Sequence, residues 1–221
     1  MKKYILIILI IFSTFNSKLC SEEKCTFVSL GSHCHPAFII KYANRRLAAY
    51  PLDWVLSVNG DKIIEMLESK FEYFLDEKFL IPINSYLTHQ YYNIEFAHEG
   101  IFSEENYHIK IRDFKEKYER RIKRFLALNN EDNGKVYFIR SAWPLSNNPN
   151  YIFNDEKNIN ISEEYASRLC NALEMIFPDL NFCLVILNPS EIGKEDVTKL
   201  NQKTFVIRVG AGINEILRYC N

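Results

Sequence analysis

Four short apolar runs, separated by longer amphipathic stretches, constrain the fold of this chain more than any other feature. The runs span residues 26–30, 136–140, 182–187 and 204–209, and each is nearly continuous in apolar residues. Runs of this kind are typical of strands that are covered on both faces of a sheet. Helical periodicity occupies the intervals between them. The alternation predicts an α/β fold, a single three-layer domain around a mostly parallel sheet.

The intervals between the runs predict the helices. Pro36 suits the first turn of one helix, and Asn59 is a cap residue ahead of another. Gly193 weakens the prediction of the last helix, over residues 191–200. The alternating residues 91–96 are β-prone, whereas residues 71–82 are aromatic and irregular. Helices are expected over residues 36–49, 62–70, 103–128, 162–177 and 191–200.

The N-terminus resembles a secretory leader. Met1-Lys2-Lys3 is a short positive segment, and the apolar run from Tyr4 to Phe15 that follows has 12 residues. A helix that spans a bilayer needs about 20 apolar residues, so the run predicts a signal peptide over residues 1–20 rather than an anchor. We expect cleavage near residues 19–22, a single domain over residues 21–221, secretion or a periplasmic location, and no stable membrane span afterwards.

Composition narrows the functional classes. Hydrophobic residues make up 48% of the chain and the net charge is −1, which favours a globular protein over a disordered one. The chain has no basic tail, so nucleic acid is not an expected partner; the oligomeric state is left open. Without Cys20, five cysteines remain, and an odd number in an exported protein predicts at least one free thiol. Cys34 is the natural candidate, and a disulfide among the others is not expected.

Cys34 lies where the first apolar run gives way to a helical pattern. The positive end of a helix dipole stabilises a thiolate, and ligands of open α/β sheets gather at the carboxyl ends of strands. The alternative is a small buried residue at a tight junction. His33 and His35 flank the thiol and are candidate substrate contacts. A His-Cys-His metal site is an alternative, but no second ligand pair supports it, so neither a metal nor a cofactor is expected.

Three further residues complete a candidate catalytic set. His98 follows the alternating segment and can act as a general base for the thiol, although a surface loop histidine is the alternative. Asp53 lies in a turn after Pro51, where it can orient an imidazole or serve as a turn carboxylate. Trp54 is a candidate wall of the substrate site or a core residue.

Two polar residues end other predicted strands. Arg140 closes the second apolar run, and Asn188 follows the third. If the strands are parallel, both lie at the same edge as Cys34. Arg140 is therefore a candidate contact for a carboxylate, phosphate or oxyanion, and Asn188 a candidate polar lining residue. An internal ion pair is the alternative for Arg140.

These blocks together resemble the DUF1796 family of papain-like cysteine peptidases. The matching segments are residues 28–34, 49–55, 92–99 and 135–140, within a similarity that covers about residues 26–210. The resemblance implies Cys34 as nucleophile, His98 as its base and Asp53 as a site carboxylate, acting on peptide, amide or acyl substrates. It also implies a papain-like α+β fold as the alternative to the α/β fold. Two positions depart from the family pattern, which has Phe at Leu52 and Asp at Glu99.

Two functional hypotheses follow. The first is a secreted cysteine peptidase, or a related thiol-dependent hydrolase or acyl transferase, with a Cys34–His98–Asp53 site. The second is a non-catalytic or glycan-related α/β domain that binds an anionic or sugar ligand through Arg140 and Asn188. Thiol reactivity separates the two, since only a nucleophile should alkylate fast near neutral pH.

Overall fold

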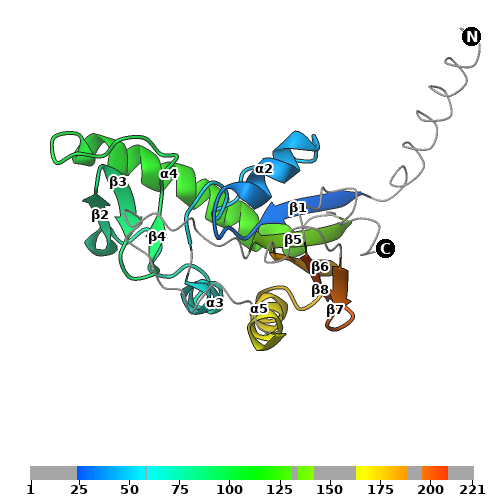
Figure 1. Ribbon diagram of the computed structural model, residues 1–221. Helices are drawn as coiled ribbons and strands as arrows, with labels where there is room; N and C mark the ends of the chain where they lie inside the picture. The colour runs from blue at the N-terminus through cyan, green and yellow to red at the C-terminus, as the bar shows by residue number, and fades with distance from the viewer. Residues whose placement is uncertain (1–23, 58, 131–133, 142–162, 189–195, 209–221) are drawn as a thin grey trace, which may run out of the picture.

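The computed structural model describes residues 24–57, 59–130, 134–141, 163–188 and 196–208 (Figure 1). The expected signal peptide, residues 1–20, lies outside these ranges. No helix among the described residues is long and apolar enough to cross a bilayer.

The four predicted strands form one sheet. β1 (Cys25–Ser29), β5 (Lys135–Ser141), β6 (Phe182–Asn188) and β8 (Thr204–Arg208) run parallel, in the order β1-β5-β6-β8. β7 (Asp196–Lys199) pairs antiparallel with the outer side of β8. The α/β prediction is therefore confirmed, and the carboxyl ends of the four parallel strands share one edge.

The helix expected over residues 191–200 is wrong where the structure describes it. Residues 196–199 form β7, which is joined to β8 by a tight turn. In that turn the amides of Lys203 and Thr204 donate to Asn201 Oδ1, at 2.8 and 2.7 Å. The segment holds β-branched Val197 and Thr198. Such residues fit a pleated strand, and the neighbouring β8 supplies the hydrogen bonds that a helix would have made internally.

Helices cover both faces of this sheet. Alternate residues of β5 point to opposite sides: Tyr137 and Ile139 pack with Ile40 of α2 (His35–Tyr42), whereas Val136 and Phe138 belong to the larger core. That larger core is built with α3 (Gly60–Glu68), α4 (Tyr107–Leu126) and α5 (Glu163–Ile176). Figure 1 shows α2 on one side of the sheet and α3 and α5 on the other. The three layers are as predicted.

α2 ends earlier than expected, at Tyr42 instead of Ala49. Asn44 adopts a left-handed conformation with φ of 54°. Its amide donates to Lys41 O at 3.0 Å, and the Arg45 amide donates to Ile40 O at 3.1 Å. This pair of bonds is a Schellman motif, which ends a helix by occupying its last carbonyls. Asn takes the left-handed position in place of the more usual Gly, because its short polar side chain tolerates it.

The other helices follow their sequence signals closely. Asn59 caps α3 as expected, since its Oδ1 accepts from the Lys62 amide at 3.1 Å. α4 begins at Tyr107, a few residues after the expected Ser103, because Asn106 Oδ1 accepts from the Ser103 amide in a turn ahead of the helix. The single-turn helices η1 (Glu77–Phe79) and η2 (Ala127–Asn130) complete the helical elements of the described residues.

A small antiparallel sheet lies beside the start of α4. It consists of β2 (Leu80–Ile83), β3 (Tyr86–His89) and β4 (Ile94–Glu95), of which only the last falls in a segment predicted to be β-prone. A single bridge joins Glu95 to Leu56, with amide-to-carbonyl distances of 2.9 Å in both directions. This bridge ties the segment that leads to His98 to the loop that follows β1 and α2 in the chain.

Candidate functional site

The turn between β1 and α2 is held against the loop of residues 52–57. Gly31 has φ of +74°, and a Cβ atom there would lie 2.7 Å from Ser57 Oγ and 3.3 Å from Leu52 O. The Ser57 amide donates to Ser32 O at 2.7 Å, and the Ser32 amide donates to Ser57 Oγ at 3.0 Å. Only glycine permits this close approach of two backbones.

Cys34 follows this turn as the N-cap residue of α2. Its side chain is exposed and its carbonyl accepts from the Phe38 amide at 2.9 Å, the first bond of the helix. The prediction that Cys34 stands at the strand-to-helix junction is therefore confirmed, and its alternative, a small buried residue, is wrong. Pro36 in the first turn has no N–H to offer.

His33 and His35 lie on either side of the thiol, with ring centroids 5.9 Å apart. The His35 amide donates to His33 Nδ1 at 3.0 Å, which leaves the proton of the neutral ring on Nε2. Burial, followed by the charges of His35 and Arg140, lowers the pKa of His33 to about 4. Burial also lowers the pKa of His35. His33 is therefore neutral near pH 7 and can donate a hydrogen bond.

Arg140 is the last but one residue of β5, at the same edge of the sheet, but its guanidinium is occupied within the protein. The residue is 2% exposed. One terminal nitrogen donates to Leu30 O at 2.7 Å and to Ser57 Oγ at 3.4 Å, and the other donates to Ser57 O at 2.7 Å. Arg140 thus joins the end of β1 to the 52–57 loop.

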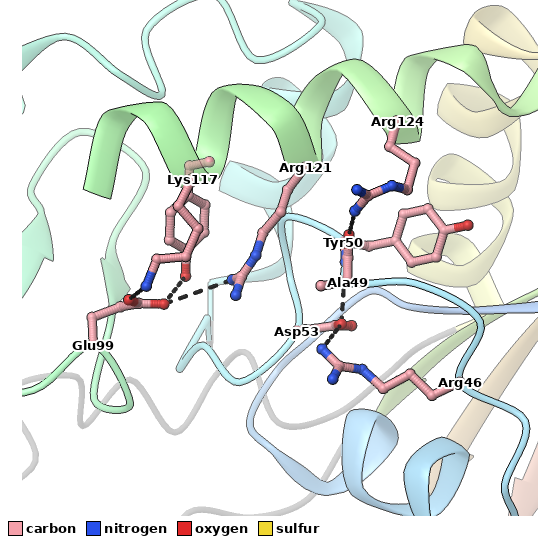
Figure 2. A network of polar contacts seen from close by, with 9 residues as sticks. Arg46, Ala49, Tyr50, Asp53, Glu99, Lys117, Arg121 and Arg124 are labelled. Carbon is pink, nitrogen blue, oxygen red and sulfur yellow. Dashed lines mark hydrogen bonds and ion pairs between the residues drawn. The ribbon is translucent and has the colours of Figure 1, made fainter. Parts of the chain in front are cut away.

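Asp53 is buried in that loop, where Arg46 and Tyr50 hold its carboxylate. Its Oδ2 accepts from Arg46 Nη2 at 2.9 Å and from the Tyr50 amide at 3.1 Å (Figure 2). Burial raises the pKa of Asp53, and the hydrogen bonds from Arg46 and Tyr50 oppose that shift. Within the described ranges, Asp53 has no hydrogen bond to His98.

Trp54 connects His98 to α2. The ring of exposed His98 meets the edge of the Trp54 ring, with centroids 5.6 Å apart. The same indole lies 5.8 Å from Lys41 Nζ and 5.8 Å from Arg46 Cζ. The 52–57 loop packs on Gly31 through Leu52, Val55 and Ser57, whereas its Trp54 ring lies by Lys41 and Arg46, at the C-terminal part of α2. The described part of the chain shows no direct contact between Cys34 and His98.

Glu99 is a site residue whose role the sequence did not indicate. Its carboxylate accepts from Lys117 Nζ and from Tyr118 Oη, the latter at 3.0 Å, and lies 3.7 Å from Arg121 Nη1. Figure 2 shows these side chains reaching from α4 to Glu99. They fix the turn that carries His98. The only signal in the sequence was the spacing of Lys117 and Arg121, which places two cations on one face of the helix.

The remaining predicted residues are Asn188 and the cysteines other than Cys34. Asn188 ends β6 opposite Arg208 of β8, at the expected edge, and its side chain lies outside the described residues. No disulfide joins Cys25, Cys34, Cys170 and Cys183 to one another, and Cys220 lies outside the described ranges. Within those ranges, no group of three His, Cys, Asp or Glu side chains is arranged to hold a metal ion.

Comparison with known proteins identifies the family. A family model described as "Putative papain-like cysteine peptidase (DUF1796)" matches residues 25–191, which include Cys34, Asp53, Trp54, His98 and Arg140. Searches of curated proteins and of solved structures give no match. Since the family model covers most of the chain, the protein belongs to the DUF1796 family.

Proposed function

We propose that this protein is a cysteine peptidase, or a closely related thiol-dependent hydrolase or acyl transferase, with Cys34 as its nucleophile. The observation that carries the proposal is the exposed thiol at the first turn of α2, at the carboxyl end of a parallel strand. An exposed thiol beside helix N–H groups is the setting in which a thiolate is stabilised and can reach a substrate. Family membership points to the same chemistry.

His98 is the proposed general base. His33 is adjacent to the thiol in sequence, but a pKa of about 4 makes it a poor proton acceptor near neutral pH. His98 is exposed and its ring contacts Trp54, a residue of the 52–57 loop that packs on Gly31 of the β1–α2 turn through Leu52, Val55 and Ser57. Catalytic hydrogen bonds are often long before substrate binds, so we assign the base from exposure and position.

The remaining residues have positioning or substrate-binding roles in this proposal. Asp53 is bonded to Arg46 and the Tyr50 amide, and it stabilises the turn that presents Trp54 to His98. It is therefore a positioning residue rather than a direct partner of the imidazole. The His35 amide holds the ring of His33 beside the thiol, so His33 is likewise a positioning residue.

The proposed reaction has two steps. Cys34 Sγ attacks the carbonyl carbon while His98 takes the thiol proton and returns it to the leaving amine, which gives a thioester. A water molecule then attacks the thioester with His98 again as base, and the thiol is released with the acid product. An acceptor amine in place of water gives acyl transfer. We propose that the activity is exerted after export, because residues 1–20 have the pattern of a leader.

The contacts of Arg140 count against the second hypothesis, a non-catalytic domain that binds an anionic or sugar ligand. That hypothesis used Arg140 as the main anion contact, but its guanidinium donates to Leu30 and Ser57 and is 2% exposed. A ligand at this edge would have to break those bonds. The thiol chemistry therefore remains the better supported function.

The test is the pH dependence of iodoacetamide labelling at Cys34, measured by mass spectrometry on wild type, His98→Ala and Cys34→Ser. The last variant identifies any labelling at the other cysteines. We expect fast labelling of Cys34 near neutral pH in wild type and labelling at least several-fold slower in His98→Ala. Slow labelling with the profile of an ordinary thiol, unchanged in His98→Ala, would overturn the proposal.

A further inference from the structure

A hollow of about 430 Å³ lies just beyond the C-terminal end of α2. It is lined by Lys41, Asn44, Arg46, Leu47, Ala48 and Ala49. Two of these residues carry positive charge and one is an amide, while the others supply a small apolar floor. This combination of a cationic rim and short side chains is suited to a small anionic group.

The walls of the hollow are fixed by hydrogen bonds. The Schellman motif sets the path of residues 43–45 and occupies the carbonyls of Ile40 and Lys41 with N–H donors. On the far wall, Arg124 of α4 donates to Ala49 O at 2.6 Å (Figure 2). Backbone carbonyls that would repel an anion are therefore engaged on both sides, and the shape does not depend on a ligand.

The charges around the hollow are predominantly positive. Lys41 is exposed and its Nζ lies over the Trp54 ring at 5.8 Å; within the described ranges it has no ion pair. The side chain of Arg46 is 28% exposed and uses one terminal nitrogen for Asp53, whose own side chain is 4% exposed. Arg124 adds a third cation behind Ala49. The Asp53 carboxylate is thus buried against Arg46, and the lining residues that the structure describes include Lys41 and Arg46 but no carboxylate.

The hollow is aligned with the thiol along α2. Phe38 follows Cys34 by one turn, as the Phe38 amide to Cys34 carbonyl bond shows. Lys41 is seven residues after Cys34, which returns it to the same helix face about 10 Å further along. Phe38 and Tyr42 lie exposed on this stretch, with ring centroids 4.6 Å apart. An extended peptide advances about 3.3 Å per residue, so about 10 Å corresponds to roughly three residues.

We propose that this hollow is a specificity subsite that binds a substrate carboxylate about three residues from the bond that Cys34 cleaves. The inference deepens the proposed function and rests on it. Lys41 and Arg46 hold the carboxylate, Asn44 adds an amide donor, and the Phe38–Tyr42 pair supports the intervening residues. The carboxylate belongs either to an acidic side chain or to the C-terminus of the peptide.

The test uses a binding measurement that does not require turnover. Immobilised Cys34→Ala protein is incubated with randomised octapeptides in two pools, and bound peptides are identified by mass spectrometry. One pool is amidated and includes Glu and Asp; the other has free C-termini and neither acidic residue. The same experiment is repeated with Lys41→Gln added, and with Arg45→Gln added as the matched control. Arg45 carries the same charge next to Arg46 but does not line the hollow.

We expect one of two groups to be retained better than neutral amidated peptides: amidated peptides that contain Glu or Asp, or peptides with free C-termini. That preference should be about tenfold weaker with Lys41→Gln and unchanged with Arg45→Gln. A charge-assisted hydrogen bond of ordinary strength gives a change of that size. The pool that is enriched tells whether the group is a side chain or a chain end. The subsite would be overturned if neither acidic amidated peptides nor peptides with free C-termini were retained better than neutral amidated peptides, or if the two charge variants gave equal losses.

Thiol labelling of the wild-type protein keeps the two proposals separate. If acidic peptides are enriched but Cys34 labels slowly, the anion subsite stands and the hydrolase proposal falls. If Cys34 labels fast and His98 is required, but no carboxylate is enriched, the hydrolase proposal stands and the subsite falls.

Discussion

Replacing Gly31 by Ala should lower the free energy of unfolding, because the new methyl group would strain the turn that leads to Cys34. A residue with φ of +74° costs roughly 1–2 kcal/mol when it has a Cβ atom, and alanine recovers about 0.4–1 kcal/mol by restricting the unfolded chain. The new Cβ would also lie 2.7 Å from Ser57 Oγ and 3.3 Å from Leu52 O. Ser57 Oγ is held by the Ser32 amide and by Arg140, so it is not free to move aside.

Overpacking of this kind costs a further 1–3 kcal/mol, roughly, and the combined destabilisation by Gly31→Ala is about 1–4 kcal/mol. Gly100→Ala is the matched control. Gly100 has a similar φ of +82°, but a Cβ there would meet only Lys110 Nζ, at 3.5 Å. We therefore expect about 1 kcal/mol or less for Gly100→Ala, from the backbone alone.

Urea unfolding followed by circular dichroism measures both variants, and Ser57→Ala supplies a double-mutant cycle. Because Ser57→Ala removes the atom that the new Cβ would approach, Gly31→Ala should be less destabilising in that background than in wild type. Equal destabilisation by Gly31→Ala and Gly100→Ala, with no coupling to Ser57, would refute the close packing of the two loops.

Two further predictions concern buried charge near the site. The free energy of unfolding should fall as the pH drops from about 6.5 toward 4. In this range His33 binds a proton in the unfolded chain, near its ordinary pKa, but stays neutral in the folded protein, where its pKa is about 4. His33 accounts for at most about 3 kcal/mol of this loss. Urea unfolding at several pH values measures the dependence, and His33→Gln should make the free energy of unfolding vary less with pH. An unchanged pH dependence in His33→Gln would contradict the lowered pKa of His33. Arg140→Met should cost about 3–5 kcal/mol by the same assay, since it leaves the Leu30 and Ser57 carbonyls without their buried donor. Arg168→Met, which removes only an exposed ion pair, should cost under about 1 kcal/mol, and similar losses in the two variants would rule out the bridging role of Arg140.

The parallel sheet was predictable because its strands are continuous apolar runs. β1, β5 and β6 each bury side chains on both faces, so apolar residues dominate their sequences, and the helices between them have their own caps and periodicity. β7 was not predictable in this way. It is a short polar edge strand whose identity depends on pairing with β8, and a local pattern contains no information about that pairing.

The end of α2 shows how a single residue can redirect a segment. The helical pattern continued to Ala49, but Asn44 adopts a left-handed conformation and closes the helix at Tyr42. Asn in that position is a weaker sequence signal than Gly. Because the helix ends early, Asn44 and residues 46–49 line a cationic hollow, which no periodicity analysis indicated.

Asp53 illustrates why the candidate site was only partly predictable. The sequence indicated a turn carboxylate, for which an imidazole was one predicted partner. The structure instead gives it Arg46 and the Tyr50 amide, and connects His98 to the loop through Trp54. A carboxylate in a turn is satisfied by whichever donor the fold brings within reach, and the sequence does not specify that donor.

By itself, the sequence determined the local features: the parallel strands, the strand-to-helix junction at Cys34 and the cap of α3. These depend on burial pattern and on backbone groups within a few residues of one another. Tertiary structure alone decided which distant groups meet, such as Arg140 with Ser57, Trp54 with His98, and Glu99 with Lys117. Those contacts depend on where loops return in space, and the loop paths are set by packing against the whole core rather than by their own residues.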